Sequence, residues 1–217
     1  EEFMGAWPDR HTYRYVKGMY TKAKMAGRME SFYQELMLRI SSEDERIIRD
    51  NDMIWFDGQD VMDKERDFNF YITTDFATSE KQSADFSVIS CWAYSSGGSW
   101  HLVDGEIGRN LMSKNIDILF NMVVKYDVKS VGVEVSGQQK GFVDWIRKEM
   151  FRRKVYFQIV EVRPSNDKLS RFQLVVPQFK QGLIWFNRDL KKTAFGKELL
   201  NELKYAVSSG FRSKHDD

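Results

Sequence analysis

The sequence predicts an α/β protein built on a sheet of mixed direction, with helices on both faces. Three segments, 68–75, 86–93 and 100–107, follow one another with only turns between them, which is typical of an antiparallel meander. Two further apolar segments, 130–135 and 155–162, each follow a stretch of helical periodicity. Because strands that alternate with helices favour parallel pairing, both kinds of pairing are expected in one sheet.

The composition is that of a folded protein. The chain has 217 residues, 42% of them hydrophobic and 14% aromatic, which allows one domain or one domain plus a small appendage. Its 33 basic and 32 acidic residues leave a net charge of +1, so any surface for nucleic acid must come from local segregation of charge. The apolar runs are too short to span a membrane, and no membrane partner is expected.

Residues 1–67 are interpreted as a helical lead-in or linker from a preceding domain. Leu, Met, Tyr and Phe recur at helical spacing over 12–24 and 27–38. Two serines followed by acidic residues resemble a helix start, which predicts another helix with the isoleucines at 47–48 on its buried face. The aromatic pair at 55–56 is expected to pack this segment onto the main domain, which begins at residue 68.

The remaining elements follow from the same patterns. Segment 68–75 alternates apolar and polar residues and ends in the carboxylate of Asp75. Segment 130–135 is almost wholly apolar, as expected for a buried parallel strand, and contains Glu134. Helices are expected over 110–126, 137–152, 168–176 and 195–207, and a short strand over 183–186.

Three carboxylates stand at the ends of segments and are the candidate metal ligands. Asp75 ends the first strand, Glu134 lies between two valines, and Asp216 or Asp217 opens the last element. In the expected strand order Asp75 and Glu134 are neighbours, and a divalent cation between two buried carboxylates would remove the cost of burying them unpaired. Asp85 is either a further ligand or the closing residue of a turn.

Other chemistries have no support in the sequence. The histidines are not spaced for zinc, and the single Cys91 lies in an apolar run, which predicts a buried thiol rather than a nucleophile. There is no Gly-rich phosphate loop ending in Lys-Ser/Thr and no Gly-x-Ser-x-Gly motif. The paired glycines at 97–98 join two strands, which is not the context of a dinucleotide fingerprint.

At these residues the chain resembles a known family. Four stretches carry the likeness in order: 71–89, 131–137, 168–186 and the terminal His-Asp-Asp at 215–217. They resemble the C-terminal nuclease domain of the large terminase subunit of tailed bacteriophages, which has a ribonuclease H-like fold. The likeness spans residues 68–217, with the C-terminal end of the domain truncated.

The resemblance implies a metal-dependent endonuclease that cuts concatemeric double-stranded viral DNA during genome packaging. Asp75 matches the first acidic ligand, Glu134 the second and Asp217 the third, with Asp216 as the alternative. Two Mg²⁺ or Mn²⁺ ions would carry out the hydrolysis, with Asp75 bridging both. Phosphate contacts are expected from Lys168, Arg171, Lys140, Arg147 and the basic cluster at 152–154.

The same resemblance implies the partners and the location. The partners would be double-stranded DNA, the portal protein, the small terminase subunit and an ATPase domain of the same full-length chain. The protein would work in the host cytoplasm, transiently docked on the viral procapsid. Two alternatives remain open at this point: another ribonuclease H-like nuclease, such as a junction resolvase or a transposase, and a non-catalytic docking module of a packaging motor.

Overall fold

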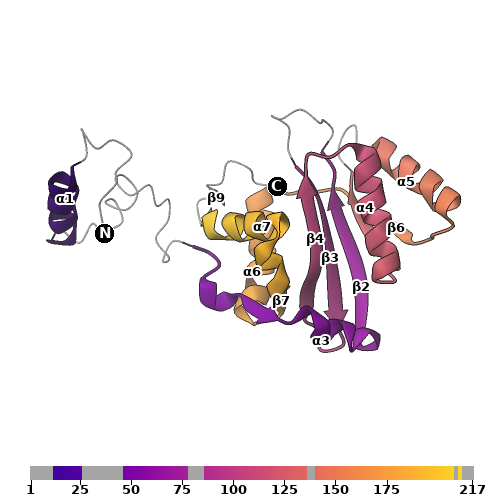
Figure 1. Cartoon of the computed structure of the whole chain (residues 1–217), viewed down its shortest axis with the longest axis horizontal. Helices are drawn as coiled ribbons and strands as arrows, with labels where there is room; N and C mark the ends of the chain where they lie inside the picture. The colour runs from indigo at the N-terminus through magenta and orange to yellow at the C-terminus, as the bar shows by residue number, and fades with distance from the viewer. Residues whose placement is uncertain (1–11, 26–45, 78–85, 136–139, 208–209, 212–217) are drawn as a thin grey trace.

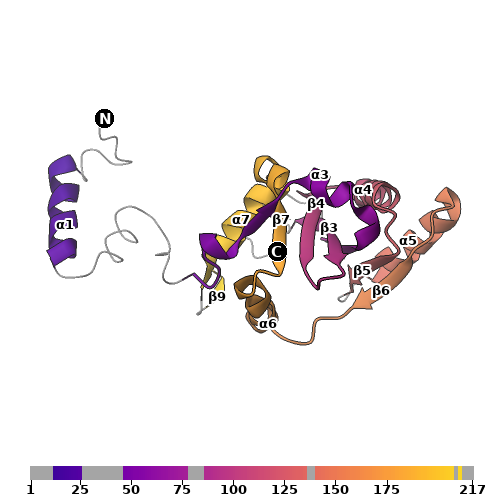
Figure 2. The ribbon, with the colours of Figure 1, turned by 90° about the horizontal axis from the view of Figure 1, so that it is seen from below.

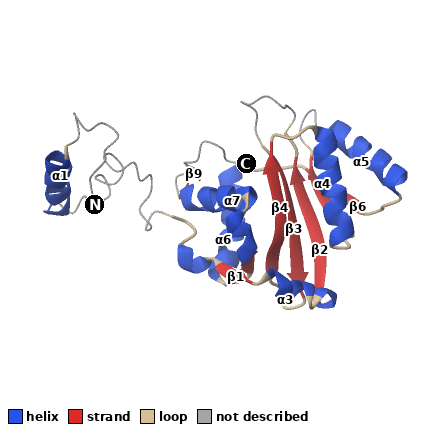
Figure 3. Cartoon of the chain, viewed as in Figure 1, coloured by secondary structure: helices blue, strands red, loops and turns tan. Residues whose placement is uncertain are grey.

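The computed structural model describes residues 12–25, 46–77, 86–135, 140–207 and 210–211 (Figure 1). Figure 3 shows its helices and strands by colour. The α-helices are α1 (Tyr13–Met25), α3 (Gly58–Met62), α4 (Met112–Lys125), α5 (Lys140–Arg153), α6 (Lys168–Lys180) and α7 (Ala194–Tyr205). The strands are β1 (Ile54–Phe56), β2 (Phe68–Asp75), β3 (Ser87–Ser95), β4 (Trp100–Gly108), β5 (Ser130–Glu134), β6 (Gln158–Val162), β7 (Ile184–Asn187), β8 (Ala206–Val207) and β9 (Gly210–Phe211). Short 3₁₀ turns are η2 (Asp50–Asp52), η3 (Glu65–Asp67) and η5 (Arg188–Lys192).

In the described part of the chain, seven strands form one sheet in the order β1-β7-β4-β3-β2-β5-β6. The consecutive strands β2, β3 and β4 pair antiparallel, while β5 pairs parallel to β2 and β6 parallel to β5. On the other side β7 and β1 extend the sheet with parallel pairing. This confirms the predicted mixed sheet of ribonuclease H-like order, with the first strand of the meander inside the sheet and the fourth strand beside it.

The two faces of the sheet bury separate cores. On one face, Ile89 and Cys91 of β3 pack with Leu119 of α4 and Ile146 of α5. On the other, Leu102 of β4 packs with residues of α6 and α7. Figure 2, seen from below, shows α4 and α5 apart from α6 and α7. The predicted helices on both faces are therefore present, and the alternation of side chains along β3 decides which residue enters which core.

The segment before residue 68 contributes to the folded body. β1 pairs with β7, and Phe56 is 7% exposed in the first core, as expected of the aromatic pair. Ile48 is buried in the second core, but residues 47–48 form a bend rather than the predicted helix. The helix predicted over 12–24 is present as α1, which has no buried residue and lies apart in Figure 1. The division of the chain at residue 68 stays a prediction.

Part of the second face is only partly covered in the described structure. Thr73 of β2, Gly132 of β5 and Val160 of β6 occupy one row across three strands. Thr73 is exposed and Val160 is 42% exposed. β5 is parallel to both neighbours, as predicted, and is fully buried on one face: Val131 and Val133 face the first core, whereas the alternate residues are half-buried on this open face.

Two buried residues in the sheet have pKa values shifted by their surroundings. Cys91 is fully buried, and desolvation raises the pKa of its thiol, with the charge of Asp104 adding to the effect. A buried thiol held in its protonated form is a poor nucleophile, which agrees with the sequence interpretation. His101 is 8% exposed and stands among the rings of Phe56, Phe68 and Trp185, at centroid distances of 5.1, 5.2 and 5.4 Å.

We predict that His101 makes the protein less stable in mild acid. Burial lowers the pKa of the His101 imidazole in the folded state below its usual value. Below about pH 6.5 the unfolded chain binds a proton that the folded chain does not. As the pH is lowered from about 6.5 to the pKa of the folded state, the free energy of unfolding therefore decreases. Urea unfolding above and below this pH should show the loss, and His101→Phe should reduce it. An equal pH dependence in both proteins would contradict this assignment.

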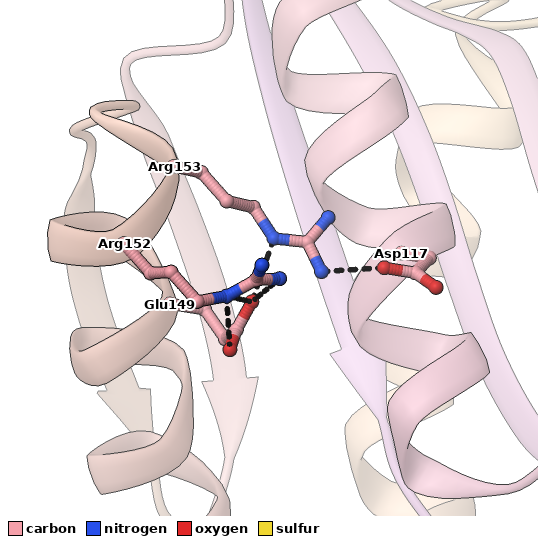
Figure 4. A network of polar contacts seen from close by, with 4 residues as sticks. All are labelled: Asp117, Glu149, Arg152 and Arg153. Atoms are coloured by element: carbon pink, nitrogen blue, oxygen red, sulfur yellow. Dashed lines mark hydrogen bonds and ion pairs between the residues drawn. The ribbon is translucent and has the colours of Figure 1, made fainter.

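A network of arginines joins the two helices of the first face (Figure 4). Arg153 of α5 donates hydrogen bonds to Asp117 of α4 and to Glu149 of its own helix. Arg152 donates to both carboxylate oxygens of Glu149, at 2.6–3.0 Å. These hydrogen bonds, from Arg152 and then Arg153, lower the pKa of Glu149 to about 2. Two cations of the basic cluster at 152–154 thus have carboxylate partners within the fold.

Candidate metal site

Asp75 and Glu134 project from the same face of the sheet. The parallel register pairs Thr73 with Gly132 and Thr74 with Val133, so the next residues, Asp75 and Glu134, stand side by side at the ends of β2 and β5. Adjacent strands lie about 4.8 Å apart and side chains alternate between faces with a period of two. The two carboxylates are therefore neighbours on the open face, as the sequence predicted.

Hydrogen bonds hold the ends of these strands in place. The Ala77 amide donates to Ser87 Oγ at 3.0 Å, which ties the chain after β2 to the start of β3. The Val135 amide donates to the Val162 carbonyl at 2.9 Å, which extends the pairing of β5 with β6 beyond Glu134. The buried Thr74 hydroxyl donates to the Gly132 carbonyl at 3.3 Å between the two carboxylate-bearing strands. The backbone on both sides of each carboxylate is thus anchored.

Both carboxylates line one cavity of about 440 Å³, which we call the carboxylate cavity. Its opposite wall comes from the N-terminal half of α6, with Lys168 and Arg171, and from α7. Apolar side chains of α6, α7 and β9 complete it, among them Phe172, Val175, Leu203 and Phe211. Asp75 and Glu134 therefore place negative charge on one wall, and Lys168 and Arg171 place positive charge on the part of the facing wall formed by α6.

Cations on α6 reach toward the acidic wall. Arg171 Nη1 lies 3.8 Å from Glu134 Oε2, and 42% of the arginine side chain is exposed. This ion pair explains in part how a glutamate is tolerated among valines. Lys168 Nζ lies 5.7 Å from the centre of the Phe211 ring, which faces Phe172 at 5.5 Å. Helix α6 begins at Asp167, whose side chain caps the Ser170 amide at 3.0 Å, and this cap orients the turn that bears both cations.

A third carboxylate of the cavity was missed by the sequence interpretation. Glu202 of α7 lines the cavity together with Leu199 and Leu203 of the same helix. Its position between two inward-facing leucines was the signal that could have revealed it, because residues three or four apart share a helix face. Within the described residues no three Asp, Glu, His or Cys side chains are close enough together to hold a metal ion. Glu202 therefore does not complete a ligand set with Asp75 and Glu134.

The residues fit a hard divalent cation as part of a larger ligand set. Carboxylate oxygens are the ligands that Mg²⁺ prefers, and two of them converge here at a half-buried, water-accessible position. The remaining predicted ligands, Asp85, Asp216 and Asp217, lie outside the described residues. Phe211, the last described residue, lines the carboxylate cavity, so the chain approaches the site shortly before the two terminal aspartates.

The other predicted phosphate contacts stand elsewhere. Arg147 lies on α5, where it pairs with Asp144 at 3.2 Å and with Glu161 at 3.6 Å, and it does not line the carboxylate cavity. Lys140 is the first residue of α5, and its side chain lies outside the described part. Of the predicted phosphate-binding residues whose side chains the structure describes, Lys168 and Arg171 are brought to Asp75 and Glu134, and Arg147 is not.

Comparisons with known proteins add structural likenesses only. No protein-family model and no curated protein matches the sequence. The large terminase nuclease of thermophilic phage G20c with bound magnesium is 20% identical, with 70% of this chain and 76% of that chain covered and a TM-score of 0.47. Its structure with bound cobalt gives a TM-score of 0.49 at the same identity, with 70% and 77% covered.

Holliday junction resolvases resemble the chain more distantly. The fowlpox virus resolvase in complex with junction DNA is 13% identical, with 64% of this chain and 88% of that chain covered and a TM-score of 0.35. RuvC of T. thermophilus bound to a junction substrate is 11% identical, with 52% and 78% covered and a TM-score of 0.34. At these identities the strand order of the chain itself is the firmer evidence of its fold.

Proposed function

We propose that the protein is a divalent-metal-dependent nuclease that hydrolyses phosphodiester bonds of DNA. One observation carries the proposal: Asp75 and Glu134 stand side by side on one wall of a cavity whose facing wall bears Lys168 and Arg171. Carboxylates hold hard cations, and lysine and arginine bind phosphate. The space between the two walls is therefore suited to a phosphodiester group.

Each residue has a part in this proposal. A bound Mg²⁺ or Mn²⁺ pair would activate water and stabilise the leaving oxygen. Asp75 and Glu134 would hold the cations from the ends of two hydrogen-bonded strands. Asp217, or Asp216 beside it, is the third ligand in the proposal. Asp217 follows Phe211 by six positions, and six residues of extended chain reach up to about 20 Å.

On the phosphate side, Arg171 and Lys168 position the DNA backbone. The Arg171 guanidinium presents several donors in one plane, which matches two oxygens of a phosphate. Its 3.8 Å separation from Glu134 leaves an ion pair that a phosphate entering the cavity can rearrange. Because surface ion pairs of this kind contribute about 0–1 kcal/mol, exchanging one partner for a phosphate is inexpensive.

The biological role in the proposal is the cutting of concatemeric double-stranded viral DNA during genome packaging. Its partners would be the portal protein, the small terminase subunit and an ATPase domain of the same chain, with the protein docked on a procapsid in the host cytoplasm.

A junction resolvase or transposase would share the acidic site. Cleavage of a linear duplex and of a four-way junction, compared side by side with Mn²⁺, separates these roles. Preference for the junction would reject the packaging role, and failure to cut either would leave a docking module.

We predict that Arg171→Gln weakens DNA binding and its dependence on salt. Losing one phosphate contact should reduce the slope of log affinity against log salt concentration by about 0.9 for duplex DNA. Arg147→Gln should change the slope less, because that guanidinium is already paired with Asp144 and Glu161. Fluorescence anisotropy of a labelled duplex over a salt series measures both. Equal slopes for the Arg171 variant and the wild type would remove Arg171 from the interface.

A further inference from the structure

A second, smaller hollow adjoins the carboxylate cavity. We call it the tryptophan hollow; it measures about 220 Å³ and is lined by Thr73, Trp92, Trp100, Val175, Gln178 and Ile184. Val175 of α6 lines both spaces. Thr73 precedes Asp75 by two residues on the same strand and face, a separation of about 7 Å. A ligand at the carboxylates can therefore extend into the tryptophan hollow.

The rings of the tryptophan hollow are held in fixed orientations. Trp92 Nε1 donates a hydrogen bond to Ser90 Oγ at 3.0 Å, and Ser90 Oγ lies 2.7 Å from Thr73 Oγ1. The Trp100 ring packs against Tyr94 with a centroid distance of 4.5 Å. Both indoles are half-buried and come from adjacent antiparallel strands. Rigid aromatic faces of this kind bind a planar partner at low entropic cost.

The lining selects an uncharged, planar ligand. Among the residues that the structure describes, no charged side chain lines the tryptophan hollow, whereas Lys168 and Arg171 line the adjoining carboxylate cavity. A phosphate is therefore favoured in the first space and disfavoured in the second. The Gln178 amide offers both donors and an acceptor at the wall, and its side chain makes no hydrogen bond within the described residues. Aromatic faces with one amide at the edge are suited to a nucleobase.

We propose that the tryptophan hollow receives an unpaired nucleobase of the DNA strand whose backbone lies at Asp75 and Glu134. The inference rests on the proposed nuclease function and adds a substrate class: DNA with an unstacked base within one or two nucleotides of the cut. Val175 lines both spaces, and Thr73 of the tryptophan hollow stands two residues before Asp75 on β2. A mismatched or single-stranded base enters the tryptophan hollow at the lowest free-energy cost, because no Watson–Crick pair has to be broken.

The test compares DNA substrates that differ in whether they carry an unpaired tail and whether that tail has its bases. Metal-free protein is titrated into three labelled DNAs of one sequence: a blunt duplex, the duplex with a short unpaired tail, and the tailed duplex with abasic sites in its tail. We expect the tailed DNA to bind about tenfold more tightly than its abasic counterpart, which is the usual effect of stacking one base. Equal affinity for these two DNAs in the wild-type protein overturns the inference without any variant.

Two variants of α6 form a matched pair. Val175→Phe places a ring in the tryptophan hollow and should abolish the preference for the intact tail. Leu174→Phe adds the same ring next to it on a side chain that is 71% exposed and lines neither space, and should keep the preference. Gln178→Ala should reduce the preference without filling the hollow. A preference that persists in both Val175→Phe and Gln178→Ala overturns the inference, as does its loss in Leu174→Phe.

The same preparations separate this inference from the nuclease function. Plasmid nicking with Mn²⁺ by the wild-type protein tests the nuclease function, and the abasic comparison tests the tryptophan hollow. Nicking without discrimination between intact and abasic tails overturns only the base-binding inference. Absence of both nicking and DNA binding overturns the two together.

Discussion

Asp75→Ala is expected to abolish metal-dependent nicking of plasmid DNA. Asp75 is the carboxylate that would bridge both cations, and it ends a strand that is paired on both sides, so no neighbouring residue can take its place. Loss of residues that only support metal ligands costs about 10–100-fold, so loss of a direct ligand should lower the rate by more than about a hundredfold. The rate of conversion of supercoiled to open-circular plasmid with Mn²⁺ measures this.

A second readout shows whether the effect comes from the metal. Titration of Mn²⁺ by calorimetry should give weaker binding for Asp75→Ala and Glu134→Gln than for the wild type. Asp60→Asn is the matched control, because Asp60 is exposed on α3, which precedes the start of β2, whereas Asp75 ends that strand. Unchanged nicking or unchanged Mn²⁺ binding in Asp75→Ala would remove Asp75 from the site. The same loss in Asp60→Asn would show that the assay responds to the overall negative charge of the protein rather than to the proposed ligands.

Gly196→Ala is expected to lower the free energy of unfolding by about 1–3 kcal/mol, the usual cost of forcing an atom into a packed interior. A Cβ at Gly196 would lie 1.9 Å from the Leu190 carbonyl oxygen, which is backbone and cannot turn aside. The Gly196 amide also bonds to the capping Thr193 hydroxyl at 3.0 Å, so the first turn of α7 cannot shift freely. Urea unfolding followed by tryptophan fluorescence measures the loss.

Gly141→Ala is the matched control for this substitution. Gly141 is also a helical glycine, in α5, and a Cβ there meets nothing within 4 Å. Because alanine favours helix over glycine by about 1 kcal/mol, this variant should be as stable as the wild type or more stable. A stable Gly196→Ala protein would show that α7 can move away from η5. Equal destabilisation of both variants would contradict the role of close packing.

The packing of α7 matters to the site as well as to stability. A Cβ at Gly105 of β4 would lie 2.1 Å from the Phe195 ring, so this glycine lets α7 settle flat against the sheet. Leu199 and Leu203, farther along α7, then reach the wall of the carboxylate cavity. The expected loss of stability in Gly196→Ala should therefore be accompanied by weaker Mn²⁺-dependent nicking, although no ligand is altered.

Much of the fold could be predicted because local patterns decide it. Strand 68–75 and its neighbours alternate with a period of two, and the helices show apolar residues at helical spacing. The prediction failed where local pattern and tertiary packing disagree. Residues 47–48 have the apolar character of a helix face, but Ile48 is buried from a bend. Segment 54–56 is too short to show a period, and its strand exists because β7 offers an edge.

For the candidate site, the sequence alone determined the type and order of the groups. Asp75 and Glu134 were recognisable as carboxylates at the ends of apolar segments. Parallel pairing of their strands follows because two antiparallel strands, β3 and β4, and then the helix α4 lie between them. Only the tertiary structure decided what faces them. The packing of α6 against the sheet brings Arg171 to Glu134 and places Val175 between the carboxylate cavity and the tryptophan hollow. Arg147, on α5, is instead paired with Glu161. The physical reason is that strand pairing follows local periodicity, whereas the packing of a helix on a sheet depends on side chains distant in sequence.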